Sequence, residues 1–160
     1  MPVPTNEVTM GRQLETAENG PLTLEAAGGT QDLFIITGGP IYLERLTGII
    51  TTEIDCTATC IANLVHDPET TAAVDMCLAA GGLNIDGLLV DSQLNIDGVP
   101  GNAMVATIVG VVLAPSFSAN HMILAPGTVS LFTVGAAIVG AITWTIVYRP
   151  LGFGISVVAA

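Results

Sequence analysis

The sequence predicts an all-β domain, an antiparallel β-sandwich of jelly-roll-like form that follows an extended N-terminal arm. Apolar residues make up 51% of the chain but aromatic residues only 4%, and 18 glycines separate them. β-branched residues favour strands, and glycine favours the tight turns between them. From residue 33 onward short apolar runs alternate with turn signals, without the period of an amphipathic helix. Eight to ten short strands at this spacing are typical of sandwiches and jelly rolls.

The chain is expected to divide into an arm, residues 1–30, and a single sandwich domain, residues 31–160. The arm region holds three prolines, the Gly28-Gly29 pair and scattered polar residues with no sustained period. One short helical turn is expected at 12–17, and segments of this kind often become ordered only against a partner. The first residues show neither a basic region nor an apolar core, so no signal peptide is expected.

The strands of the domain are read from the apolar runs between turn signals. A Gly38-Gly39-Pro40 turn separates the first two, and Gly48 is expected to mark a bulge in the second. Four prolines fall at or just beyond strand ends, where the missing N–H is tolerated. The expected strands are 33–37, 41–54, 57–65, 71–80, 103–113, 121–124, 129–134, 141–148 and a closing edge strand at 155–159.

Charge is scarce and one-sided. Fourteen acidic residues face three arginines and no lysine, a formal net charge of −11. Nucleic-acid binding is not expected, because phosphate contacts need clusters of Lys and Arg, and neither is adhesion to an anionic membrane. Every acidic residue lies within residues 1–97. Residues 98–160 contain no acidic residue and only two basic ones, Arg149 and His121. This C-terminal part is expected to be deeply buried, packed against copies of itself, or placed in lipid.

The alternative to a sheet is a membrane span at 129–148. These twenty residues contain no charged side chain, and Arg149 follows them directly. This run passes the length test for a transmembrane helix. Thr, Val and Ile outnumber Leu in it, which favours a strand, and Gly135 and Gly140 divide it into strand-sized pieces. Its second half also alternates with a period of two, the larger apolar side chains being Ile142, Trp144, Ile146 and Tyr148. A pair of strands is therefore preferred to a membrane anchor.

The three cysteines, Cys56, Cys60 and Cys77, are expected to be buried free thiols. Two cysteines four residues apart on one strand lie about 13 Å apart at 3.3 Å per residue, too far for a disulfide. An odd count in a chain of this length does not suggest a disulfide framework. Assembly in a reducing cytoplasm is consistent with free thiols.

The pentapeptide LNIDG occurs twice, at 83–87 and 94–98. A calcium loop of the EF-hand type that began at Asp86 would need Gly at its sixth position and Glu at its twelfth, where this chain has Asp91 and Asp97. A solenoid would need at least three repeats. Asp-Gly supplies the positive φ of tight turns, so two turns are expected, and cation binding remains the alternative.

No residue pattern indicates catalysis. The sequence holds no GxSxG, no phosphate-binding glycine loop and no HExxH. His66 lies beside Asp67 in an expected turn, far in sequence from His121, and a joint metal site would need both with a carboxylate. Glu53 and Asp55 point to one side of a strand, as most carboxylates of a solvated face do. We therefore expect no enzyme activity, no cofactor and no metal.

Three segments resemble small β-rich proteins of tailed bacteriophages. Residues 144–160, WTIVYRPLGFGISVVAA, resemble an ending of the form W-x-x-x-Y-x-P-L with a short G-x-x-VVA tail. Residues 33–53, LFIITGGPIYLERLTGIITTE, are similar to an opening in which a TGG turn precedes a strand with L-x-G and a T-T pair. The VDMCL segment at 74–78 resembles a V-D-L-C stretch. The resemblance extends roughly over residues 31–160 and implies a capsid cement or decoration protein.

The resemblance implies a non-enzymatic virion protein that is often a homotrimer and that binds the major capsid protein. It would be assembled in the host cytoplasm and would lie on the outer surface of the capsid, with no nucleic acid or membrane as partner. Aromatic residues and arginine are enriched in binding hot spots. The expected interface residues are Trp144, Tyr148 and Arg149, followed by Tyr42, Arg45 and His121.

Two other functions and one other role stay open at this point. Trp144 is equally well explained as an ordinary core residue. A small membrane protein anchored through 129–148 is one alternative function. An extracellular β-sandwich binding module, using the LNIDG loops for a cation or a glycan, is the other.

Overall fold

The computed structural model describes residues 13–57, 59–77, 82–107 and 122–160. These residues form twelve strands in two antiparallel sheets of six strands each, and this part of the chain contains no helix. The all-β, antiparallel fold class predicted from the sequence is therefore confirmed.

The first sheet, called sheet A, is built around the longest strand, β3 (Ile41–Asp55), which has 15 residues. The short strand β9 (Met122–Leu124) pairs with the beginning of β3. The other strands in spatial order are β1 (Glu15–Thr23), β11 (Val139–Pro150), then β3 itself, β7 (Gln93–Asn95) and β8 (Val105–Thr107).

The second sheet, called sheet B, includes the edge strand β12 (Ser156–Ala159) at the C-terminal end of the sequence. The short strand β6 (Leu83–Asn84) pairs with the beginning of β4 (Ile61–Pro68). The strands in spatial order are β12, β2 (Gly29–Thr37), β10 (Gly127–Val134), β4 and β5 (Val74–Asp75).

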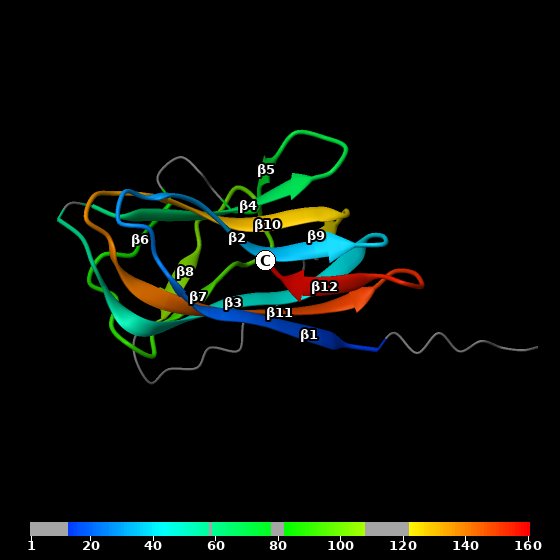
Figure 1. Cartoon of the computed structure of the whole chain (residues 1–160), viewed down its shortest axis with the longest axis horizontal. Coiled ribbons are helices and arrows are strands. Elements are labelled where there is room, and N and C mark those ends of the chain that lie inside the picture. The colour runs from blue at the N-terminus through cyan, green and yellow to red at the C-terminus, as the bar shows by residue number, and fades with distance from the viewer. Residues whose placement is uncertain (1–12, 58, 78–81, 108–121) are drawn as a thin grey trace, which may run out of the picture.

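The two sheets face each other across one apolar core. Figure 1 shows them as two layers, with β4, β10 and β2 opposite β3, β11 and β1. One cluster of buried side chains joins the layers, including Phe34 and Leu131 of sheet B and Ile50 and Trp144 of sheet A. Burial of these apolar side chains is the main stabilising term of such a fold.

The scarcity of charge in the C-terminal part follows from its place in the sheets. β10 lies between β2 and β4, and β11 lies between β1 and β3, so each is a central strand of its sheet. A central strand packed on the core has little surface on which to carry a charged side chain. Of the three explanations considered, deep burial is thus sufficient for the described strands of this part.

The rival membrane span at 129–148 falls into β10, the turn after it and β11. Among the described residues, no helix is long and apolar enough to cross a membrane. Ile142, Trp144, Ile146 and Tyr148 are all buried, as predicted for the inward series. In the predicted outward series Thr143, Thr145 and Arg149 are partly exposed, but Val147 is buried at 7% exposure, so the period of two holds except at Val147.

The structure differs from the expected arm at residues 15–23, which form β1 and pair with β11 from Glu15 opposite Tyr148 to Thr23 opposite Ala141. The expected helical turn at 12–17 is wrong for its described residues. The alternation was missed because three of the four half-buried positions of β1 carry Glu15, Ala17 and Asn19, and only the fourth, Leu22, is a large apolar residue. Residues 1–12 lie outside the described part of the chain.

The predicted strand boundaries hold for some strands and not for others. β3, β10, β11 and β12 start and end within two residues of the prediction. β2 begins at Gly29, four residues before the predicted start, and β4 begins at Ile61 rather than at residue 57. The expected strand 71–80 contributes only Val74–Asp75, and the expected strand 103–113 only Val105–Thr107. Residues 78–80 and 108–113 of these predictions lie outside the described residues.

The bulge expected at Gly48 is not there. Gly48 stands in regular register opposite Trp144, and the shifts between β3 and β11 fall on either side of it. A Cβ at Gly48 would lie 3.0 Å from atoms of the Trp144 ring and from Ile142. The glycine is therefore needed to make room for the indole inside the core.

Candidate functional site

Two of the residues expected at an interface lie in the core instead. Trp144 is 0% exposed and Tyr148 is 3% exposed, so neither can contact a partner on the surface of this fold. Both belong to the inward-facing series of β11. In this structure Trp144 has the burial of the ordinary core residue that the sequence also allowed, and the interface role of the two residues stays a prediction.

Tyr148 instead connects three strands through hydrogen bonds. Its hydroxyl donates a hydrogen bond to Glu15 Oε2 at 2.7 Å and accepts one from the backbone N–H of Val157 at 3.3 Å. Burial, together with the Glu15 carboxylate, raises the pKa of Tyr148 to about 12. The phenol therefore remains protonated at neutral pH and links β11 to β1 and β12.

Three other predicted residues, Tyr42, Arg45 and Arg149, come together on the outer face of sheet A. Arg149 pairs in register with Tyr42, and Val147 beside it pairs with Arg45. Arg149 also forms an ion pair with Glu44, and its side chain remains 39% exposed. Arg45 is exposed and Tyr42 is half-buried. His121, the sixth predicted residue, lies outside the described part of the chain.

The same region exposes apolar side chains that the sequence did not single out. Ile123 pairs in register with Tyr42 and is 64% exposed. Leu14, which precedes β1 next to the Glu15–Tyr148 pair, is 53% exposed. We call the set Tyr42, Arg45, Ile123 and Arg149 the sheet A corner. It combines aromatic, aliphatic and guanidinium groups, the composition of many protein-binding surfaces.

The outer face of sheet B has a different character. Asp32, Asp67 and Asp75 are all exposed there, and Ser130 donates a hydrogen bond of 2.8 Å to Asp32. Ile35 and Val158, which pair in register, are 39% and 50% exposed. Both arginines of the described residues thus lie on the outer side of sheet A, where Glu44 pairs with Arg149, whereas the charged residues named here on the outer side of sheet B are all aspartates.

The LNIDG segments form turns, as predicted. Gly87 and Gly98 have φ of 72° and 80°. Asp86 accepts a hydrogen bond from the backbone of Cys56 at 3.1 Å, and Asp97 accepts one from the backbone of Val99 at 2.8 Å. Each carboxylate therefore already stabilises a turn of its own chain.

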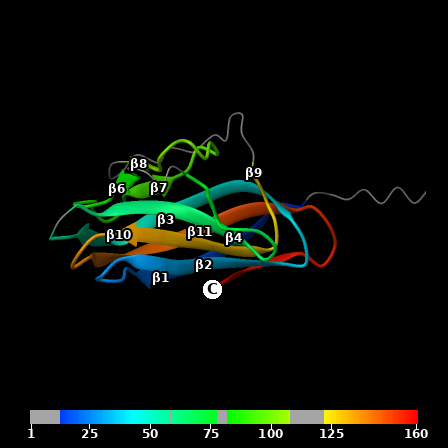
Figure 2. The ribbon, with the colours of Figure 1, turned by 90° about the horizontal axis from the view of Figure 1, so that it is seen from above.

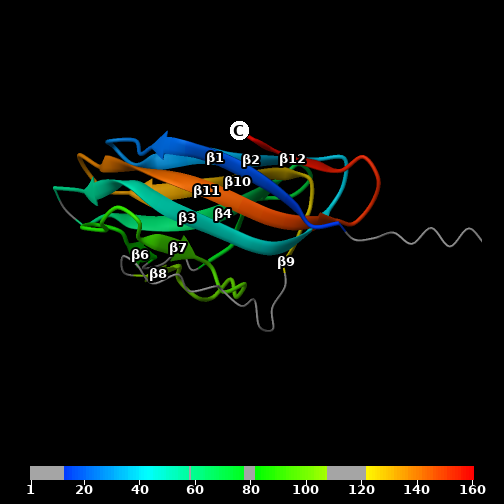
Figure 3. The same ribbon diagram turned by 90° about the horizontal axis from the view of Figure 1, so that it is seen from below.

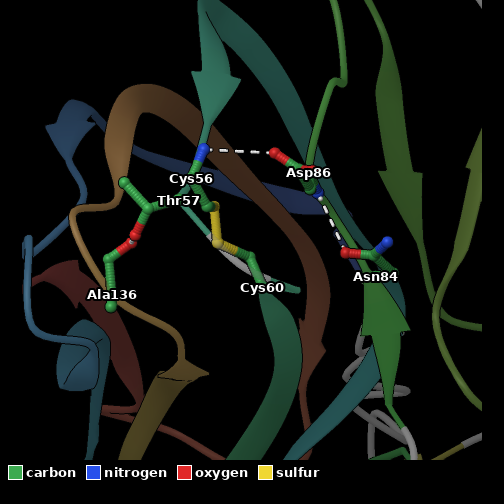
Figure 4. The surroundings of a disulfide bond; sticks show 6 residues. All are labelled: Cys56, Thr57, Cys60, Asn84, Asp86 and Ala136. Atoms are coloured by element: carbon green, nitrogen blue, oxygen red, sulfur yellow. Dashed lines mark hydrogen bonds between the residues drawn. A yellow bond between two sulfur atoms is a disulfide. The ribbon is translucent and has the colours of Figure 1, made fainter.

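The prediction for Cys56 and Cys60 is wrong, because these residues form a disulfide with a Cα–Cα distance of 6.4 Å. The distance argument failed because the two cysteines do not share a strand. Cys56 follows β3 and Cys60 precedes β4, so both lie in the connection between two strands, where their sulfur atoms meet (Figure 4). Thr57 beside them donates from its backbone N–H and its hydroxyl to Ala136 O, at 3.2 and 3.1 Å.

Cys77 is a buried free thiol, as predicted. Its Sγ donates to Asn63 Oδ1 at 2.9 Å and accepts from the backbone N–H of Leu64 at 3.2 Å. Burial raises the pKa of this thiol above its ordinary value. A protonated, buried thiol is a poor nucleophile, so Cys77 has a structural role.

The side chains considered for catalysis remain apart. The described residues contain no group of three or more His, Cys, Asp or Glu placed to hold a metal ion. His66 is buried at 3% exposure with its Nδ1 3.2 Å from Thr128 O, and burial lowers its pKa. Glu53 and Asp55 are both exposed on β3.

The chain was compared with protein-family models, with curated proteins and with solved structures, and no match was found in any of the three. A function for this fold therefore has to be argued from its own geometry. The feature that the geometry offers is the sheet A corner, where three of the six residues predicted for an interface are brought together.

Proposed function

We propose that this chain is a non-enzymatic capsid decoration protein that binds the major capsid protein of a tailed bacteriophage and stabilises the head. The observation that carries the proposal is the sheet A corner, where Tyr42, Arg45 and Arg149 lie beside the 64% exposed Ile123. Residues of these types dominate the energetics of protein interfaces. The resemblance of residues 31–160 to phage decoration proteins names the partner.

A jelly-roll-like sandwich is part of this proposal, and the strand pairing supports it. β1 pairs with β11, β2 with β10, β3 with β7 and β4 with β6, which makes a nested series from the ends of the chain inward. Folding a long hairpin onto itself produces such nesting. Jelly rolls of this kind are common in viral capsid proteins and in lectins.

The proposed location is the outer surface of the virion, with the protein assembled in the host cytoplasm as a homotrimer. The acidic outer face of sheet B, with Asp32, Asp67 and Asp75, would suit a surface turned toward solvent. Of the arm predicted at 1–30, the proposal keeps only the residues before β1, which would contact neighbouring subunits.

The test is cosedimentation of the purified chain with capsids of its phage assembled without it. The wild-type chain is expected to bind, and a Tyr42→Ala/Arg45→Ala double variant is expected to bind at least tenfold more weakly, as about 1.4 kcal/mol or more is lost at a hot spot. Glu53→Ala, an exposed change on the same strand, serves as the control and should bind like the wild type. A wild-type chain that ignores capsids would overturn the proposal.

One observation favours the alternative of an extracellular binding module. The Cys56–Cys60 disulfide is a feature of proteins that mature in oxidising surroundings. If the LNIDG turns bound calcium, the ion would raise the melting temperature and a chelator would lower it. The decoration protein proposed here should melt at the same temperature under both conditions, because Asp86 and Asp97 already accept hydrogen bonds from their own chain.

A further inference from the structure

Two glycine-containing segments more than one hundred residues apart in sequence meet at one end of the molecule. The turn between β2 and β3 contains Gly38-Gly39-Pro40, and the loop between β11 and β12 is 151–155, LGFGI. The backbone N–H of Leu151 donates to Pro40 O at 3.2 Å. Figures 1, 2 and 3 all show this loop at the end of the two sheets, next to the turn between β2 and β3.

The packing between the two segments is backbone against backbone. Gly38 has φ +81°, and a Cβ on it would overlap the carbonyl oxygen of Gly154. A Cβ on Gly39 would lie 3.0 Å from the side chain of Ile155, which packs against the core. Immediately beyond, the hydroxyls of Thr37 and Ser156 are hydrogen-bonded at 3.0 Å. The loop is therefore held in one conformation by the turn beneath it.

This fixed loop holds its largest side chain away from the protein. Phe153 is 82% exposed, more than any other large apolar side chain of the described residues, and Leu151 in the same loop is 39% exposed. Single exposed apolar residues are common, but an aromatic ring at this exposure loses the favourable burial that folding normally gives. In this structure the ring lies almost entirely in solvent.

The loop continues directly from the sheet A corner. Pro150, the last residue of β11 before the loop, pairs with Ile41, and Arg149 before it pairs with Tyr42. The exposed ring thus lies in the loop that follows β11, and Arg149 near the end of β11 already belongs to the sheet A corner. Phe153 follows Arg149 by four residues in the sequence. Aromatic residues and arginine are both enriched in protein interfaces.

We propose that Phe153 is an aromatic anchor that inserts into an apolar pocket of the protein partner, with the glycine-packed loop 151–155 holding it in its bound conformation. This proposal rests on the proposed function, in which the partner is the capsid shell. A bilayer is the weaker candidate, because a chain of net charge −11 without lysine is repelled by anionic lipid. A loop already ordered in the free protein loses little conformational entropy on binding.

The experiment compares the wild type with Phe153→Ser, Phe153→Leu and Val139→Ser in cosedimentation with capsids assembled without the chain. Phe153→Ser is expected to weaken binding at least about tenfold, whereas Phe153→Leu, which keeps an apolar anchor, should lose less than about fivefold. Val139 is 60% exposed at the other end of sheet A, so Val139→Ser is the matched control and should bind like the wild type. Because both side chains are exposed, all variants should melt within about 2 °C of the wild type.

Each contrary result points to a different conclusion. Equal binding of Phe153→Ser and the wild type would overturn the anchor and leave the decoration function standing. Failure of the wild type to bind capsids would overturn both. Two further measurements test whether Phe153 contacts something other than the capsid. One is binding to vesicles of phosphatidylcholine, and the other is sedimentation of the chain alone. Phe153-dependent binding to these vesicles, or Phe153-dependent self-association, would replace the protein pocket with lipid or with a second copy.

Discussion

Gly48 shows how one residue can set the packing of the whole core. Its missing side chain gives the space that the Trp144 ring occupies, with ring atoms 3.0 Å from where a Cβ would be. We expect Gly48→Ala to lower the free energy of unfolding by about 1–3 kcal/mol, the usual cost of overpacking. Urea denaturation measures this loss.

Gly101→Ala is the control for this substitution. A Cβ at Gly101 has nothing within 4 Å, so this variant should change stability by less than about 0.5 kcal/mol. Equal stability of the two variants would show that the indole does not lie against Gly48.

His66 predicts a pH dependence of stability. Burial lowers the pKa of His66 in the folded state below the ordinary 6.5, which the unfolded chain retains. The unfolded state therefore binds more protons as the pH falls through 6.5, and protonation favours unfolding. We expect the contribution of His66 to the free energy of unfolding to be constant above pH 7.5 and to decrease from there to pH 5.5.

A His66→Gln variant tests the origin of this slope in denaturant titrations at each pH. It should be less stable at pH 7.5 but should show a flatter profile between pH 7.5 and 5.5. An unchanged slope in the variant would assign the effect to other groups.

The burial of a side chain could be predicted where it belongs to an alternating pattern of apolar residues. It could not be predicted for a residue outside such a pattern. Trp144 and Tyr148 belong to an alternation that assigns them to the core, although their residue types also suggest an interface. Phe153 stands between two glycines and belongs to no period, so nothing in the sequence indicates its 82% exposure. The loop that carries Phe153 packs against the turn at Gly38-Gly39, and this contact exists only in the folded chain.

At the scale of elements, strands were found where apolar residues mark the inward face. β1 was not predicted because its inward positions include Glu15 and Asn19, whose polar groups form hydrogen bonds with particular partners. Asn19 donates to Leu33 O at 2.6 Å, and Glu15 accepts from Tyr148. These partners lie far away in sequence, so such a strand cannot be recognised from its own residues.

The connection between β3 and β4 carries a testable covalent element. The Cys56–Cys60 disulfide closes a short loop, for which chain entropy gives about 2 kcal/mol of stabilisation. We expect reductant to lower the melting temperature of the wild type by several degrees. A Cys56→Ser/Cys60→Ser variant should melt at the lower temperature with or without reductant.

A thiol count gives an independent check of the same bond. The unreduced, denatured wild type should react with a thiol reagent once, through Cys77 alone. Three reactive thiols would mean that the bond does not form.

At the scale of the molecule, the all-β fold class could be predicted from the sequence, but the reason why the C-terminal part lacks charge could not. Burial, self-association and lipid all remained open, because the order of strands within a sheet depends on pairings between distant segments. The nested pairing places β10 and β11 at the centre of their sheets, and this alone accounts for their composition. The remaining charge is then gathered on the outer faces and turns.

This gathering of acids predicts that salt stabilises the fold. A net charge of −11 produces self-repulsion that is greater in the compact state than in the unfolded chain, and salt screens it. Among the described residues one ion pair, Arg149–Glu44, would be weakened by the same screening. We expect the melting temperature to rise by a few degrees between about 20 mM and about 500 mM NaCl.

A Glu53→Gln/Asp55→Asn variant provides the comparison, since both side chains are exposed on β3 and the change removes two of the negative charges. Its melting temperature should exceed that of the wild type at low salt, and the difference should shrink as the salt concentration increases. Parallel curves for the two proteins would show that neighbouring carboxylates do not repel each other enough to matter. A melting temperature that falls with salt would mean that attractive pairs, rather than the excess of acids, dominate the electrostatics of this protein.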